Sequence, residues 1–259
     1  SSSVLVNGYF VGDEVRVTGH SAETLSEQSL VFADGSTVVL KDLLDGGQNT
    51  DGHQIDRGEG EYRISLDGTG SDGTWSTILF GDEITGSDLH LSANGDDLIL
   101  QLHQDGNPTD DQVVLEGAAA QSGAVDTLIF NDESRLALSD LAVHHAGDAS
   151  DNSLVGVNGH ANVFVGGAGN DSLQASDGVD QFHFNRGDDQ DSISGLGDDD
   201  QLVLGSAISQ SDLDASVDNG DTVIRLLVDG NASGDQIVLE GKTLENLRTA
   251  SITFDDGSS

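Results

Sequence analysis

The chain has 259 residues and carries 47 acidic against 9 basic residues, a formal net charge of −38 at pH 7. Repulsion on this scale opposes a compact fold unless cations neutralise it, and it makes nucleic acid and anionic membrane surfaces poor partners. There is no cysteine, which excludes disulfides and thiolate zinc sites. No apolar run approaches the roughly eighteen residues of a transmembrane helix, so we expect no membrane span.

Residues 1–44 are predicted to be a partial module or an exchangeable N-terminal segment. Residues 29–43 align with residues 127–141 at a constant offset of 98, so the chain opens near the end of a repeating unit. Residues 1–7 remain as an unassigned extended segment. Such a segment could add a strand to a neighbouring molecule.

Two further modules follow, predicted at residues 45–141 and 142–259. Residues 79–117 align without gaps with residues 203–241, and 17 of these 39 positions are identical. Upstream, Arg57 and Arg186 lie in matching Arg-Gly-acid triplets. We therefore expect both arginines to share a structural role, paired with local carboxylates, and we do not expect Arg186-Gly187-Asp188 to act in cell adhesion.

The secondary structure is predicted to be almost entirely strand and turn. Residues 97–102 and 221–227 are predicted strands, because each apolar run follows an Asn-Gly turn signal. Single helical turns are expected at residues 41–44, 87–89 and 211–213. No stretch has the periodicity of a long helix, so we expect an all-β fold.

The most specific motif is a glycine-rich nonamer. Residues 166–174 (GGAGNDSLQ) fit the pattern G-G-x-G-x-D-x-U-x, where U is apolar. Residues 147–155, 175–183 and 195–203 fit the same frame with fewer matches, which predicts a short roll over residues 147–203. In each frame the glycines form a turn, and the apolar residue of the following strand points inward.

This pattern suits calcium, which takes six to eight oxygen ligands from carboxylates and backbone carbonyls. Alternate nonamers lie on the same side of the coil, so Asp171 should pair with Asn152 or Asp191, and Asp180 with Asp200. The candidate ligands are Asn152, Gly167, Gly169, Asp171, Gly178, Asp180, Asp191, Asp198 and Asp200. Acidic hairpin turns that bind no metal remain the alternative.

The nonamers resemble the repeats-in-toxin (RTX) family of secreted bacterial proteins. The segments that follow them resemble the hemolysin-type calcium-binding-protein related module. This resemblance implies a short parallel β-roll combined with antiparallel β-sandwich-like modules in tandem. It also implies a chain that stays unfolded at cytoplasmic calcium, leaves through a one-step channel and folds outside, at the bacterial surface or in a matrix.

We expect no catalysis, because the motifs H-E-x-x-H and G-x-S-x-G are both absent. The favoured hypothesis is a calcium-stabilised extracellular structural or adhesive module. One alternative is a subunit that forms homo-oligomers, head-to-tail filaments or a surface matrix by donor-strand exchange. Another is an accessory carbohydrate-binding module of a secreted polysaccharide-acting enzyme, with Tyr62 and Trp75 stacking on sugar rings.

Overall fold

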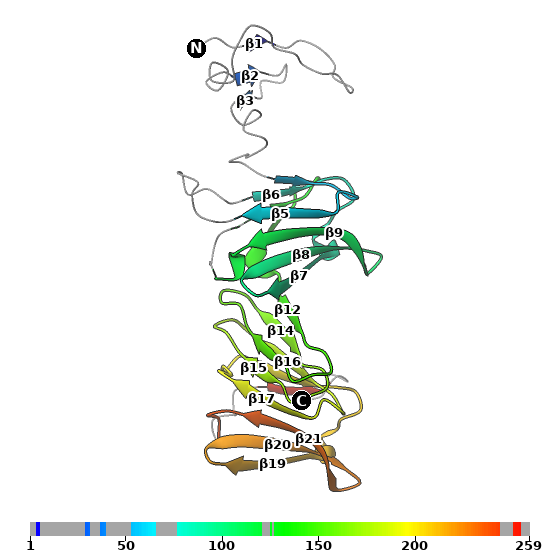
Figure 1. Ribbon diagram of the computed structural model, residues 1–259, viewed down its shortest axis with the longest axis vertical. Helices are drawn as coiled ribbons and strands as arrows, with labels where there is room; N and C mark the ends of the chain where they lie inside the picture. The colour runs from blue at the N-terminus through cyan, green and yellow to red at the C-terminus, as the bar shows by residue number, and fades with distance from the viewer. Residues whose placement is uncertain are drawn as a thin grey trace.

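The computed structural model describes residues 4–5, 29–31, 37–39, 53–65, 77–120, 125, 127–243 and 251–254. From residue 53 onward the strands lie like rungs along the long axis of the molecule (Figure 1). Within the described residues, no helix is long and apolar enough to cross a membrane. The predicted all-β fold is confirmed.

The elements have the following bounds. The strands are β1 (Val4–Leu5), β2 (Ser29–Val31), β3 (Thr37–Val39), β4 (His53–Ile55), β5 (Glu61–Ser65), β6 (Thr77–Phe80), β7 (Leu89–Asn94), β8 (Asp97–Gln104), β9 (Asn107–Glu116), β10 (Thr127–Ile129), β11 (Arg135–Ala137), β12 (Val143–Ala146), β13 (Ser153–Val155), β14 (Asn162–Val165), β15 (Ser172–Gln174), β16 (Gln181–Phe184), β17 (Gln190–Ser194), β18 (Gln201–Leu204), β19 (Leu213–Asp218), β20 (Asp221–Val228), β21 (Asn231–Leu239) and β22 (Ser251–Phe254). Short 3-10 turns are η1 (Gly86–Asp88), η2 (Ala118–Ala120), η3 (Leu138–Asp140) and η4 (Gln210–Asp212).

The predicted parallel β-roll is present in the second module. Strands β12, β14, β16 and β18 pair in parallel in a nine-stranded sheet, while β13, β15 and β17 pair in parallel in a six-stranded sheet. Successive strands therefore alternate between two faces, so each pair of strands is one turn of the coil. The chain sequence produces this because each nonamer holds one short strand and one glycine-rich turn.

Side chains that alternate along the strands fill the core between these faces. Phe164 and Phe182 are fully buried and stack with ring centroids 4.8 Å apart. Leu173 and Ile193 lie in register on the opposite face and join the same cluster. Burying one large apolar side chain contributes about 1.5–3 kcal/mol, and β16 and β18 each bury two, Phe182 with Phe184 and Leu202 with Leu204.

The antiparallel part of the prediction corresponds to two three-stranded meanders, β7–β8–β9 and β19–β20–β21. Each meander continues a sheet of the roll, because β9 pairs in parallel with β5, and β21 pairs in parallel with β17. Equivalent strands fall on opposite faces: β7–β9 lie in the nine-stranded sheet and β19–β21 in the six-stranded sheet. Successive modules are thus related by half a turn about the roll.

The partial module at the N-terminus pairs within its own chain. Strand β1 lies parallel to β2, and β2 is antiparallel to β3, in the same order as β6, β10 and β11. Val4 and Leu5, which belong to the segment that donor-strand exchange would use, pair here with Leu30 and Val31. The remaining residues of that segment lie outside the described part of the chain.

The short helical turns expected at residues 87–89 and 211–213 are present as η1 and η4. The turn expected at residues 41–44 lies outside the described residues. In both η1 and η4 an aspartate at the last position accepts a hydrogen bond from the backbone of the residue before the turn, Thr85 in one module and Ser209 in the other. These turns place Asp88 and Asp212 where each can meet an arginine.

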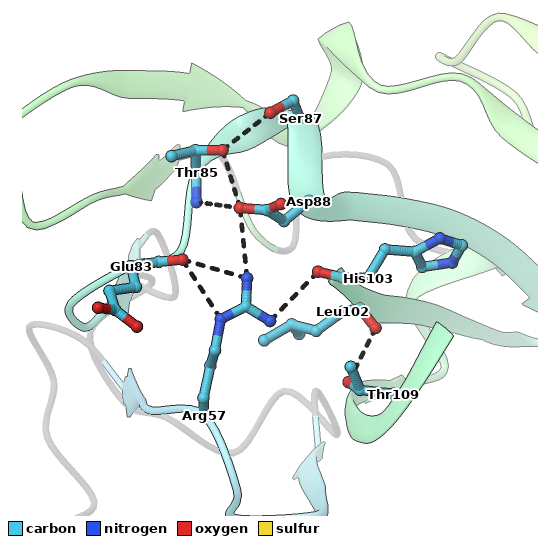
Figure 2. A network of polar contacts seen from close by, with 8 residues as sticks. All are labelled: Arg57, Glu83, Thr85, Ser87, Asp88, Leu102, His103 and Thr109. Carbon is cyan, nitrogen blue, oxygen red and sulfur yellow. Dashed lines mark hydrogen bonds and ion pairs between the residues drawn. The ribbon is translucent and has the colours of Figure 1, made fainter. Parts of the chain in front are cut away.

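Arg57 ties three segments of the first module together (Figure 2). Its Nε and Nη2 donate to the carbonyl oxygen of Glu83 at 3.3 and 3.1 Å, and its Nη1 donates to the carbonyl of His103 at 3.2 Å. Its Nη2 also lies 3.4 Å from the Asp88 carboxylate. The guanidinium therefore joins the β6–η1 loop to the end of β8.

Arg186 makes the same contacts in the second module. It donates to the carbonyl oxygens of Ala207 at 2.8 Å and Leu227 at 3.1 Å, and it pairs with Asp212 at 3.1 Å. Each of these partners is 124 positions after its counterpart in the first module. The predicted pairing of both arginines with local carboxylates is confirmed.

We call each arginine with its two carbonyl partners and its aspartate an arginine clamp. Substituting Arg186 tests how much the clamp of the second module contributes to stability. We expect Arg186→Ala to lower the free energy of unfolding by about 1–3 kcal/mol, because two carbonyls and a carboxylate lose their donor. Arg186→Lys should recover only part of this loss, since one ammonium cannot replace the planar fork. Urea unfolding with calcium present measures the effect, with the exposed Arg135→Ala as control; equal losses at both positions would contradict it.

Candidate metal centre

The aspartates of the nonamers lie where glycine-rich turns enter strands. Asp171 immediately precedes β15, Asp180 precedes β16 and Asp200 precedes β18, and their exposed fractions are 2%, 0% and 1%. Because parallel strands stack in register, residues at equivalent places beside them stack as well. The aspartates consequently form one ladder on each side of the roll.

The first ladder contains Asn152, Asp171 and Asp191. The backbone N–H of Asn152 donates to Oδ1 of Asp171 at 2.8 Å, and the N–H of Asp171 donates to Oδ1 of Asp191 at 3.0 Å. Each carboxylate thus binds the main chain of the preceding turn on its side. The structure brings together the residues that the eighteen-residue spacing had paired.

The second ladder contains Asp180, Asp200 and a residue that sequence reasoning missed, Asn162. The N–H of Asn162 donates to Oδ1 of Asp180 at 3.0 Å, and the N–H of Asp180 donates to Oδ1 of Asp200 at 2.9 Å. In the sequence, residues 156–164 (GVNGHANVF) put Ala161 at the aspartate position of the nonamer frame, so the frame predicts no ligand in this turn. Asn162, one residue later and fully buried, occupies that place in the structure.

One carboxylate oxygen in the first ladder lacks a partner. Oδ2 of Asp171 is buried and accepts no hydrogen bond, whereas Oδ2 of Asp180 accepts from the N–H of Ser176 at 2.7 Å, and Oδ2 of Asp200 from Gly197 at 2.6 Å. Burying an anionic oxygen without a partner is costly. A cation beside Asp171 would remove that cost, so the residues present fit a metal ion here.

Backbone carbonyls supply the remaining oxygen atoms near these turns. Gly167 and Gly169 have φ of 94° and 116°, the left-handed region that other residues rarely adopt. A Cβ at Gly167 would lie 2.3 Å from the carbonyl oxygen of Asp148, and one at Gly178 would lie 1.9 Å from that of His160. Adjacent turns therefore pack carbonyl oxygen against glycine, and any side chain would fill the space.

Asp198 belongs to the turn that leads into Asp200, but it is exposed where Asp200 is buried. Its side chain is 72% exposed and its Oδ1 is 4.0 Å from Nζ of Lys242. Across the described residues, no group of three or more His, Asp or Glu side chains is placed to hold a metal. A calcium ion between the turns would therefore take most of its ligands from carbonyl oxygens, with one or two carboxylates or amides added.

The ladders concentrate negative charge. Burial raises the pKa of the Asp191 carboxyl from 3.8 to about 7, and the nearby Asp171, Asp188 and Asp189 add to the rise, although the N–H of Asp171 opposes it. Burial likewise raises the pKa of Asp188. Without a cation, the folded roll therefore disfavours the ionised forms of Asp188 and Asp191, two carboxyls that are ionised in the unfolded chain at neutral pH.

Comparison with known proteins identifies these turns. Residues 157–191 match the family model described as the RTX calcium-binding nonapeptide repeat, in four copies. Residues 157–191 therefore carry RTX calcium-binding nonapeptide repeats. Calcium is accordingly the ion that this segment binds, as predicted.

Other comparisons add little. No curated protein matches the chain significantly. A solved structure, the extracellular lipase LipA from Serratia marcescens, is similar with a TM-score of 0.33 and 17% identity, over 74% of this chain and 34% of the lipase chain. At that similarity, the likeness supports no conclusion about the fold or activity of this chain.

The pKa of Asp191 predicts how pH acts on the calcium-free RTX roll. Between about pH 4 and 7 the folded state holds a proton that the unfolded chain has lost, so stability should fall as pH rises, by on the order of 4 kcal/mol in total. Calcium-stripped protein should therefore retain more β circular dichroism at about pH 5 than at about pH 8. Asp191→Asn should flatten this dependence; an unchanged slope would assign it to other groups.

The buried ladders also predict which carboxylates govern calcium affinity. Asp171→Asn and Asp180→Asn should each weaken binding by about tenfold or more, because affinity follows the charge and number of the ligands. Asp229→Asn, in an exposed turn at φ of 52° that asparagine adopts readily, is the matched control. Isothermal titration calorimetry measures the difference, and equal losses in all three variants would show a general charge effect instead.

Proposed function

We propose that this chain is a calcium-stabilised, extracellular structural repeat module of a secreted bacterial protein, with no catalytic activity of its own. The unpartnered Oδ2 of Asp171, buried within a ladder of RTX turns, is the observation that carries the proposal. The buried side chains of Asp171 and Asp180 bind the main chain of neighbouring turns, which supports a structural role for them.

Calcium would act on folding through the aspartate ladders. Two carboxylates about 4 Å apart repel by roughly 4 kcal/mol at an effective dielectric constant near 20. A divalent ion between them reverses the sign. With free calcium about 1,000 times above its dissociation constant, each site adds roughly 4 kcal/mol, which is comparable to the whole stability of a marginal domain.

Secretion fits this dependence. The chain has no cysteine, so it cannot be stabilised by disulfides, and bound metal ions are another stabilising link in small extracellular domains. Its net charge of −38 also favours binding of cations. Where calcium is scarce the roll would stay open, and where it is abundant the roll would close. The match to RTX repeats supports a chain that folds after export.

A structural role is favoured over the two alternatives. For donor-strand exchange, the candidate strand Val4–Leu5 is already paired with β2 of its own chain. For carbohydrate binding, Trp75 lies outside the described residues, and Tyr62 lies on β5 opposite Val113 of β9. Neither alternative gains a specific contact in the part of the chain described.

The dependence on calcium should differ between the modules. In the first module the place of Asp191 is taken by Tyr62, because Tyr62 pairs with Val113 as Asp191 pairs with Ile237. The meander β7–β8–β9 also packs into a continuous apolar core that it shares with β6 and β10, with Leu98, Leu100 and Leu102 almost fully buried. We expect the roll to need calcium and this meander to need it much less.

Removing calcium tests the proposal directly. Chelator should remove much of the β circular dichroism and raise the hydrodynamic radius, because the aspartate ladders then repel without compensation. In hydrogen exchange, amides of residues 147–204 should lose protection before those of β7–β9. A spectrum and radius unchanged in excess chelator would refute calcium-controlled folding, and magnesium at the same concentration serves as control.

A further inference from the structure

The outer edge of β19 is equivalent to an edge that is occupied elsewhere in the same chain. In the first module Leu89 of β7 pairs with Leu102 of β8, and in the second Leu213 of β19 pairs with Leu226 of β20. Both meanders also carry a register shift at the same place between their second and third strands. Strands β7 and β19 therefore present the same kind of edge.

In the first module this edge joins the two modules. Strand β12 pairs in parallel with β7, Val143 opposite Leu91 and His144 opposite Ser92. On its other side β12 pairs with β14, so it is the first rung of the RTX roll. The edge of a finished meander is thus the place where a new roll begins.

In the second module the corresponding edge is bare. Strand β19 ends the six-stranded sheet, and among the described residues no strand pairs with its outer side (Figure 1). The side chains reflect this: Leu91 is 1% exposed, whereas its equivalent Ala215 is exposed, and Val217 is 49% exposed. A strand of six residues with unpaired N–H and C=O groups is a template for another strand.

The charges on this edge select its partner. Strand β19 has Asp214 and Asp218 where β7 has His90 and Asn94, so two β19 edges would oppose acid to acid. At the existing junction the rings of His90 and His144 are 5.6 Å apart. A strand like β12 on β19 would therefore place an imidazole near the Asp214 carboxylate, an attractive pair in place of two histidines.

We propose that the outer edge of β19 accepts, in parallel, a strand of the Val143–Ala146 type from a second copy of this module. The roll would then lengthen through the same junction that β7 and β12 make. This inference goes beyond calcium-dependent folding, because it assigns the bare edge as a docking site for a further copy. It predicts Ala215 opposite the counterpart of Val143, and Ser216 opposite the counterpart of His144.

A lengthened chain tests the junction. Residues 131–259 would be repeated directly after Phe254, which is equivalent to Phe130, so that the added copy enters as residues 131–146 do here. With calcium present, the amides of residues 213–218 should exchange at least about tenfold more slowly than in the original chain. The proposal is overturned if the added roll is protected and binds calcium while β19 exchanges as before.

Two matched variants separate docking from general stability. In the original chain, Ala215→Asp should not change the exchange rates of residues 213–218, because that side chain is exposed. In the lengthened chain it should remove the protection that the added strand gives to β19. Val228→Asp changes another exposed side chain, at the end of β20 away from the edge, and should not alter the protection of β19. Equal effects of both variants in the lengthened chain would overturn the assignment.

A second measurement covers a lengthened chain that fails to fold. A synthetic peptide of residues 139–148, titrated into the original chain with calcium, should slow exchange in residues 213–218, and a scrambled peptide should not. No protection at millimolar peptide, or protection by self-association of the original chain alone, would overturn the proposed occupant. Calcium binding is measured separately, so failure of the junction is distinguishable from failure of calcium-controlled folding.

Discussion

The roll depends on buried carboxylates that bind the main chain of the preceding turn on the same side. Oδ1 of Asp171 and Oδ1 of Asp180 each accept a backbone N–H from the turn before. Parallel strands this short offer few ladder hydrogen bonds, so the side-chain bonds fix the spacing between turns. The same geometry buries a carboxylate in four successive half-turns, at Asp171, Asp180, Asp191 and Asp200. The coil can therefore close only if the charge of these carboxylates is neutralised, and calcium bound between the turns neutralises it.

This constraint explains why the two modules differ although their meanders are nearly the same. The first module has Tyr62 in the place of Asp191 and draws its stability from an apolar core shared by two sheets. The second holds a stack of aromatic rings, His145, Phe164 and Phe182, flanked by the aspartate ladders. Each module nevertheless keeps its arginine clamp, because that clamp secures the meander and not the ion-binding turns.

Much of this architecture could be predicted from the sequence, because it follows from local patterns. The glycine-aspartate frame predicted the parallel roll and the stacking of Asp171 on Asp191, and the matching Arg-Gly-acid triplets predicted that both arginines pair with local carboxylates. Asn162 was missed because a one-residue shift of the turn moved it out of the frame. The sequence also did not predict that the second meander lies on the opposite face of the roll from the first. That placement depends on how many strands a whole module contributes to each face. The pairing of Val4 with Leu30 depends on a long-range contact that has no local signal.

The meanders also explain how a parallel roll can be interrupted and then resume. Three antiparallel strands are an odd number, so the direction of β7 is the same as that of β9 and β5, and β12 can pair with it in parallel. A two-stranded hairpin would reverse the direction and leave an edge on which no parallel turn could form. On the opposite face, the four-stranded sheet of β4, β6, β10 and β11 matches the four strands β5, β9, β8 and β7. Both faces therefore advance by the same number of strands, and Val143 of β12 joins the buried apolar cluster of the first module.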